Sequence, residues 1–266
     1  MRLPILIYHD IGNTDTNVPS VESDLYSIAP DTFEGHLQSI VRRQVSTLTM
    51  EDLIRTCNNG TSHTTGICLT FDDGYLSNYD TVCPLLTQYG IKGSFFITTG
   101  QVGWPQRVTW GQLREMSDAG FSIQSHSRTH SYLSSYEPDK LREELRQSKN
   151  DLEQHLGRRV IAFAPPYGDW PQHAASIANT CGYQIICTSR PGFNDSPFQF
   201  QKLRRFSMRG PQATQNLLAY LDGNRITSLG ARSRGLLLRV AKGCLSIKQY
   251  HALRSAVLRM RQASRV

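Results

Sequence analysis

The sequence predicts an α/β protein in which parallel strands and helices alternate to form a closed or nearly closed barrel. Three observations support this fold class. About seven apolar segments of strand length alternate with segments of helical periodicity. No internal repeat or low-complexity linker interrupts that order. Polar or turn-forming residues follow four of the strands, as at the active rim of such barrels. Spacing alone does not distinguish the barrel from a doubly wound sheet.

The elements are predicted in the following order. A strand over 3–8 is followed by a helix over 29–43, in which Phe33, Leu37 and Ile40 share one face. Later strands are predicted over 45–49, 66–71, 92–98, 121–125, 160–164, 183–188 and 202–208. Further helices are predicted around 79–86 and over 109–120, 137–156 and 171–182, and Gly120 ends one of them.

Composition is typical of a soluble globular protein of one large or two small domains. The chain has 266 residues and a mass of 30.0 kDa, with 39% hydrophobic and 19% charged residues. Its six cysteines are scattered without a CxxC pair, which argues against a disulfide scaffold or a thiolate zinc site. The first apolar stretch, LPILIY, is too short for a signal peptide, so we expect a buried strand and a cytoplasmic protein.

The net charge of +7 is concentrated at the C-terminal end. Residues 223–266 contain ten of the 29 Lys and Arg residues and no acidic residue, which leaves 19 basic against 22 acidic residues in 1–222. We therefore predict that the barrel spans 1–222 and that a basic, helical extension follows over 223–266. A nucleic-acid enzyme would spread positive charge over its active face, so nucleic acid is not an expected partner.

Four predicted strands end on residues suited to chemistry. GICLTF is followed by Asp72 and Asp73, FSIQS by His126 with His130 four residues later, and ILIY by His9. VIAFA is followed by the turn PPYG. Since the carboxyl ends of barrel strands meet at one rim, these residues are expected to lie together there.

Two histidines and a carboxylate form a three-ligand set that leaves room for water, as in catalytic zinc sites. Taken alone, the HSRTH spacing arises readily by chance among eight histidines, and DDG is a common turn sequence. A histidine that closes a strand is also more often structural than catalytic. Their combination at the ends of neighbouring strands favours a metal site.

LTFDDGYLSN, SHSRTH and FAPPYG resemble the successive motifs of the polysaccharide deacetylases, carbohydrate esterase family four, also called the NodB-homology domain. The resemblance spans about residues 3–210 and implies a distorted (β/α)7 barrel that removes acetyl groups from sugars with a bound metal. It implies that Asp72 is the catalytic base, that Asp73, His126 and His130 are the metal ligands, and that the Tyr167 backbone N–H contributes to the oxyanion site.

Two departures from the family pattern concern the same reaction. Ala164 stands where the family has an arginine that steadies the base aspartate, and no histidine lies between His173 and His251 to serve as the usual catalytic acid. A subgroup similar to the poly-N-acetylglucosamine deacetylases carries its acid histidine on the first strand, in a start like LPILIYH. TSRPGFN at 188–194 is also similar to that subgroup. By this resemblance His9 is the acid.

The resemblance implies a hydrolase that uses one divalent ion, zinc or alternatively cobalt or nickel. The expected substrate is an N-acetylated amino-sugar glycan or a lipid-linked glycan precursor. A deformylase of a lipid-linked amino sugar and a non-catalytic glycan-binding barrel are the alternatives. Trp104, Trp110, Trp170 and Pro166 are candidate substrate contacts, although ordinary packing explains each tryptophan equally well.

In the extension, Tyr250, Leu253, Val257 and Met260 fall on one helical face, with basic residues elsewhere. One interpretation is a helix packed on the barrel. The other is an amphipathic helix lying on an anionic membrane, which would place a cytoplasmic enzyme on the inner membrane face beside lipid-linked sugars.

Overall fold

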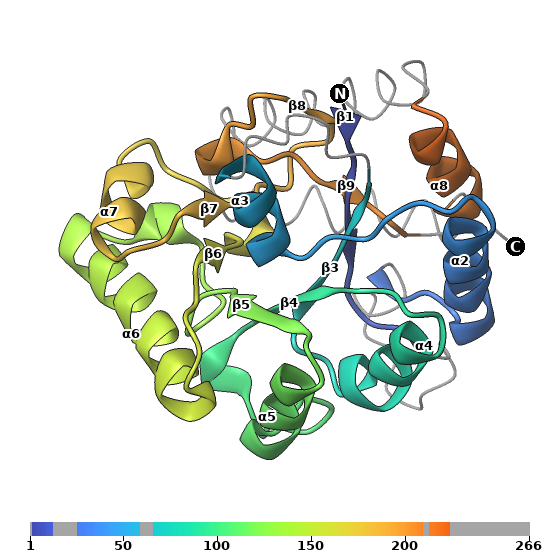
Figure 1. Ribbon diagram of the computed structural model, residues 1–266. Helices are drawn as coiled ribbons and strands as arrows, with labels where there is room; N and C mark the ends of the chain where they lie inside the picture. The colour runs from blue at the N-terminus through green and yellow to red at the C-terminus, as the bar shows by residue number, and fades with distance from the viewer. Residues whose placement is uncertain (1, 13–25, 59–65, 210–212, 224–266) are drawn as a thin grey trace, which may run out of the picture.

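The computed structural model describes residues 2–12, 26–58, 66–209 and 213–223, and these form a curled sheet of seven parallel strands surrounded by helices (Figure 1). The order across the sheet is β7-β6-β5-β4-β3-β2-β9. The strands are β2 (Ile5–Tyr8), β3 (Cys68–Asp73), β4 (Ser94–Ile97), β5 (Ser122–Ser125), β6 (Ala162–Phe163), β7 (Ile185–Ile186) and β9 (Phe206–Ser207). A separate antiparallel pair consists of β1 (Arg2–Leu3) and β8 (Asn194–Asp195). The predicted (β/α)7 barrel class is confirmed.

The segment that precedes β9 brings the two edges of this sheet together. The Leu203 N–H donates to the Ile186 carbonyl (2.9 Å), and the Thr188 N–H donates to the Leu203 carbonyl (2.8 Å), so the segment runs beside β7. A few residues later β9 pairs in parallel with β2, and Phe206 lies opposite Leu6. The short stretch from Leu203 to Ser207 therefore links β7 to β2 and closes the barrel.

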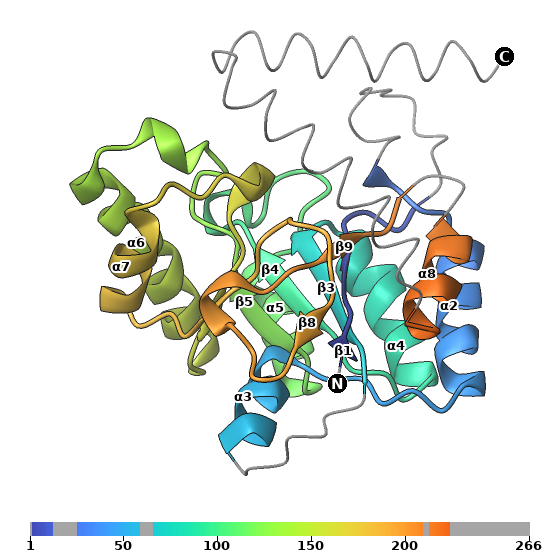
Figure 2. The same ribbon diagram turned by 90° about the horizontal axis from the view of Figure 1, so that it is seen from above.

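The helices cover the outside of the strands. They are α2 (Pro30–Arg42), α3 (Met50–Asn58), α4 (Cys83–Gln88), α5 (Trp110–Asp118), α6 (Pro138–Leu156), α7 (Ala174–Thr180) and α8 (Ala213–Leu221), and a π-helical turn, η1 (Asn78–Val82), leads into α4. A capping box between Thr109 and Gln112 starts α5, and Gly157, with a φ of 63°, ends α6. Far apart in sequence, α2 and α8 lie side by side (Figures 1 and 2). In the described part of the chain, no helix has both the length and the apolar character needed to cross a membrane.

Strand residues alternate between two apolar layers, as the period of two requires. One buried cluster includes Ile5, Cys68, Phe96, Ala162 and Ile185. The other includes their strand neighbours Leu6, Leu69, Phe95, Phe163 and Ile186, together with apolar residues of the helices. The first cluster is therefore the barrel interior, and positions 70 and 72 of β3 share the face of Cys68 that points into it.

The predicted strand over 45–49 is wrong, because these residues make only one parallel bridge, between Thr47 and Ile67. Reciprocal hydrogen bonds between Thr49 and Asp52 start helix α3 immediately afterwards and end any strand there. Helices α3 and α8 were not predicted, since neither segment has a long apolar stripe. The extension over 223–266 lies outside the described residues beyond Gly223, so its helix and its membrane contact stay predictions.

A buried histidine ties α2 to both β2 and α8. His36 is fully buried, its Nδ1 hydrogen-bonds with the Tyr8 hydroxyl (3.2 Å), and its Nε2 hydrogen-bonds with the Thr214 hydroxyl (3.0 Å). Burial lowers the pKa of His36 from 6.5 to about 4. The folded protein therefore keeps this ring neutral at a pH where the unfolded chain is already protonated.

We expect His36 to make the fold acid-sensitive. As the pH falls from about 6.5 towards 4, only the unfolded chain takes up this proton, so His36 removes on the order of 3 kcal/mol from the free energy of unfolding. His36→Gln keeps hydrogen-bonding atoms but cannot titrate there. Urea unfolding at pH 7.0 and 4.5 should show a smaller loss in the variant than in the wild type. The exposed His155, changed to Gln, is the matched control, and equal losses in all three proteins would contradict this assignment.

Candidate active site

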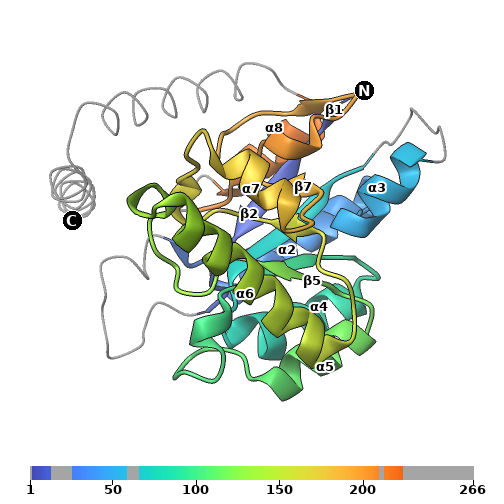
Figure 3. The ribbon, with the colours of Figure 1, turned by 90° about the vertical axis from the view of Figure 1, so that its left-hand side faces the viewer.

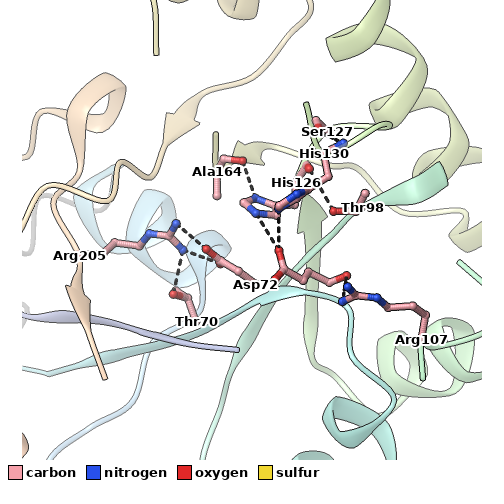
Figure 4. Close-up of polar contacts among 10 residues, drawn as sticks. Thr70, Asp72, Thr98, Arg107, His126, Ser127, His130, Ala164 and Arg205 are labelled. Carbon is pink, nitrogen blue, oxygen red and sulfur yellow. Dashed lines mark hydrogen bonds and ion pairs between the residues drawn. The ribbon is translucent and has the colours of Figure 1, made fainter. Parts of the chain in front are cut away.

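Strand β3 carries both aspartates to the rim of the barrel. The predicted strand ended before Asp72, whereas β3 continues through Asp73 because its pairing with β4 extends to Asp73 opposite Ile97. Alternation turns Asp72 into the barrel interior with Thr70, and Asp73, at a left-handed φ of 77°, begins the turn that follows. The two adjacent carboxylates thus have different partners: Asp72 pairs with Arg205 (Figure 4), whereas Asp73 contacts His126 and His130.

Asp72 forms a two-pronged ion pair with Arg205, which sequence reasoning did not identify as a site residue. The two terminal nitrogens of Arg205 lie 2.7 and 2.8 Å from the two Asp72 oxygens, and both side chains are buried (Figure 4). One of these nitrogens also donates to the Thr70 hydroxyl (3.1 Å), and the arginine Nε donates to the Thr188 carbonyl (3.3 Å). These contacts fix the carboxylate plane of Asp72.

The ion pair keeps Asp72 ionised. Burial alone would raise the pKa of Asp72, but the Arg205 guanidinium, with help from His126 and His9, outweighs it and holds the pKa below its usual value. A carboxylate in this state is ready to accept a proton.

Arg205 supplies the guanidinium that the sequence lacks at Ala164. Ala164 is fully buried, and its carbonyl accepts a hydrogen bond from His126 Nδ1 (2.7 Å), so this position acts through its backbone. Arg205 reaches Asp72 from the segment between β7 and β9 instead. One signal for it was available: in the predicted strand over 202–208, Arg205 shares a face with the apolar Leu203, which points inward.

Asp73, His126 and His130 meet beside this ion pair. Asp73 Oδ1 lies 3.1 Å from His126 Nε2 and 3.0 Å from His130 Nε2. Because the Ala164 carbonyl can only accept, His126 Nδ1 carries a proton, and the neutral ring presents a lone pair at Nε2. The predicted ligand residues are thus brought together.

This cluster fits a divalent metal ion. The three donor atoms lie within 4.8 Å of one another, and buried Asp73 Oδ1 makes no aligned hydrogen bond despite its short contacts. Lone pairs facing one another repel unless positive charge lies between them. Burial lowers the pKa of His126, but Asp72 and Asp73 outweigh this effect and raise it, so the site attracts positive charge. A carboxylate and two imidazoles that leave positions open are suited to zinc.

His9 lies at the end of β2, near both aspartates. Its carbonyl accepts a hydrogen bond from the buried Asn78 side chain (3.0 Å), and the next residue, Asp10, accepts one from Ser77 (2.6 Å). The LTFDDGYLSN motif thus anchors His9 as well as supplying the carboxylates. Burial lowers the pKa of His9, whereas the charges of Asp73 and Asp72 oppose that effect.

Tyr167 borders the cluster from the turn after β6. Its φ is 59°, its ring stacks on Tyr132 at 4.2 Å, and its ring contacts that of His130 at 4.8 Å. Pro166, beside it, is buried.

The three candidate tryptophans have different environments. Trp104 is 59% exposed in the loop after β4, as a sugar-stacking residue would be. Trp110 stacks on His155 at 3.9 Å, and Trp170 packs against Phe163 at 5.6 Å. The indoles of Trp110 and Trp170 thus each pack against another side chain of the protein.

Comparisons with known proteins point to one family. Residues 59–186 match the family model described as polysaccharide deacetylase. YxkH of Bacillus subtilis (strain 168), whose name refers to the same family, is 30% identical over 194 residues, which cover 72% of this chain and 66% of YxkH. The poly-β-1,6-N-acetyl-D-glucosamine N-deacetylase of Staphylococcus aureus (strain MRSA252) is 24% identical over 163 residues, 56% of each protein.

Among solved structures, the deacetylase PplD of Streptococcus pyogenes, determined in complex with acetate, superimposes with a TM-score of 0.74. It is 28% identical, and the match covers 83% of this chain and 98% of that chain. The chain spans only about half to two thirds of the length of the curated relatives named above.

We expect the cluster to bind one zinc ion. Titration calorimetry of the metal-free protein with zinc chloride should give a stoichiometry near one. His126→Ala removes a ligand and should abolish this binding without unfolding the barrel, because the ring lies at the rim. His155→Ala, which removes an exposed histidine from α6, is the control and should bind as the wild type does. Stoichiometric zinc retained by His126→Ala would refute the ligand assignment.

Proposed function

The chain carries a polysaccharide deacetylase domain, and from that premise we propose that it hydrolyses N-acetyl groups from an amino-sugar glycan with one divalent metal ion. The observation that carries this proposal is the convergence of Asp73, His126 and His130 beside an ionised Asp72. A ligand set and a base at one rim are what amide hydrolysis requires.

Asp73, His126 and His130 would hold the ion. When bound, a divalent cation supplies a Lewis acid that polarises the acetyl carbonyl and lowers the pKa of water. The protein contributes the base: Asp72, ionised and oriented by Arg205, accepts a proton from the attacking water. Arg205 also keeps the Asp72 oxygens aligned, so a water molecule would meet them in one fixed geometry.

The remaining steps concern charge at the carbonyl oxygen and at the departing nitrogen. The Tyr167 ring contacts that of His130, and the Tyr167 backbone N–H would donate to the oxyanion. The amine leaves poorly until it is protonated, and we infer that His9, which lies near both aspartates, supplies that proton. The negative charges of Asp72 and Asp73 favour the protonated form of His9 and partly offset the effect of its burial.

The substrate class follows from the relatives. The Staphylococcus aureus protein is named for a polymer of N-acetylglucosamine, and PplD was solved with acetate. We assign an N-acetylated glycan, or a lipid-linked glycan precursor, to this chain. The mostly exposed indole of Trp104 would stack on a sugar face near the rim. The guanidinium that Arg205 provides removes the main reason to regard the barrel as non-catalytic.

The test is acetate release from N-acetylglucosamine oligomers by the zinc-loaded protein. The wild type should release acetate, and His9→Ala should release it about 10²–10⁴-fold more slowly while keeping zinc affinity, because only amine protonation is lost. Hydrolysis of an acetate ester of a low-pKa phenol should be slowed less by His9→Ala, since that leaving group departs without a proton.

His155→Ala controls for loss of a histidine elsewhere and should behave as the wild type. A zinc-loaded wild type that releases no acetate from any N-acetylated oligomer would contradict the function. If His9→Ala slows hydrolysis of the amide and of the ester equally, or slows neither, the acid role of His9 is contradicted. The deacetylase function would then still stand.

A further inference from the structure

Helix α6 buries a carboxylate on its apolar face. The helix lies along the outside of β5 (Figure 3). Its buried residues follow the helical period and face the sheet: Leu141, Glu144, Leu145, Ser148 and Leu152. Glu144 is only 6% exposed, whereas its neighbour Glu143 is exposed and accepts a hydrogen bond from Gln147 on the same helix. A carboxylate in such a row needs compensating partners.

In the part of the chain that the structure describes, the hydrogen-bond partners of Glu144 all come from the turn between His126 and His130. One oxygen, Oε1, accepts hydrogen bonds from the backbone N–H of Arg128 (2.9 Å), the backbone N–H of Thr129 (2.7 Å) and the Thr129 hydroxyl (2.9 Å). No Lys, Arg or His in the described ranges forms an ion pair with Glu144. The carboxylate is therefore committed to this turn.

The turn has a conformation that local sequence does not favour. Ser127 and His130, neither of them glycine, have left-handed φ values of 68° and 58°. Such residues persist where their surroundings impose the conformation. From the β4 side, Thr99 N–H donates to the Ser127 carbonyl and Gly100 N–H to the Arg128 carbonyl, and a Cβ at Gly100 would lie 2.5 Å from that oxygen. Glu144 holds the opposite side.

We propose that Glu144 is a positioning residue for the metal site. Glu144 fixes the turn so that the His130 imidazole faces Asp73 and His126. It acts on the backbone one residue before His130. Without it, the Arg128 and Thr129 N–H groups lose their acceptor, and the Thr129 hydroxyl is left with the Ser131 and Tyr136 hydroxyls as partners. The turn is then free to relax its left-handed residues. His130 would then leave the position that brings its Nε2 to 3.0 Å from Asp73. The inference rests on the proposed metal-dependent function.

The test is zinc affinity, measured by titration calorimetry of the metal-free full chain. Glu144→Ala should weaken zinc binding by about 10–100-fold, as expected when a group that orients a ligand is removed. Glu144→Asp, which withdraws the carboxylate from the turn but keeps its charge, should weaken it less. Glu144→Gln keeps an acceptor oxygen in place and should restore most of the affinity. Glu143→Ala, one residue away and exposed, should match the wild type.

A second measurement separates positioning from general stability. The visible spectrum of the cobalt-loaded protein reports ligand geometry and should change in folded Glu144→Ala but not in Glu143→Ala. If Glu144→Ala does not fold, Glu144→Asp decides. The proposal is overturned if the folded variant, Glu144→Ala or otherwise Glu144→Asp, keeps the zinc affinity and the cobalt spectrum of the wild type. That result would leave the deacetylase function intact. Zinc binding that depends on Glu144 in a protein that releases no acetate would support the positioning role while contradicting the function. A wild type that binds no zinc would overturn both.

Discussion

The buried ion pair between Asp72 and Arg205 is the interaction on which the site depends. Moving two charges out of water is costly, and only close geometry with further hydrogen bonds offsets that cost. Here both Asp72 oxygens are paired, and the arginine also donates to the Thr70 hydroxyl and the Thr188 carbonyl. The pair therefore links β3 to the segment that closes the barrel. Loss of one partner would leave the other charge buried, so fold and site are constrained together.

Barrel closure explains how residues from distant parts of the chain reach this pair. His9 comes from the first strand of the sheet, Asp72 from β3, His126 from the end of β5 and Arg205 from the segment before β9. In a closed barrel a charged group can enter the rim from more than one strand. A guanidinium absent at Ala164 is therefore supplied by Arg205 from another position. In the same way, His9, the proposed acid at the end of β2, would serve in place of a histidine on a late strand.

The sequence was sufficient for the parts of the fold and site that depend on local pattern. Alternating strand and helix periodicity favoured a barrel, although spacing alone did not separate it from a doubly wound sheet. The rule that strand ends share one rim predicted that Asp73, His126 and His130 would meet. Arg205 lies 133 positions from its partner, so no local pattern could pair them, although its inward register was readable. For Glu144, the helical period alone does not say which of two adjacent glutamates is buried, and its target lies in another element. Exposure of Trp104, against packing of Trp110 and Trp170, likewise depends on tertiary contacts.

The most direct test of this account is a double-mutant cycle on the free energy of unfolding of the metal-free protein, with Asp72→Asn and Arg205→Met. Removing either partner alone leaves an uncompensated buried charge and should cost about 3–5 kcal/mol. If the ion pair organises the site, the double variant should lose little more than one single variant, which gives a coupling energy of several kcal/mol. Losses that simply add, within about 0.5 kcal/mol, would mean that the two groups do not depend on each other and would contradict the account.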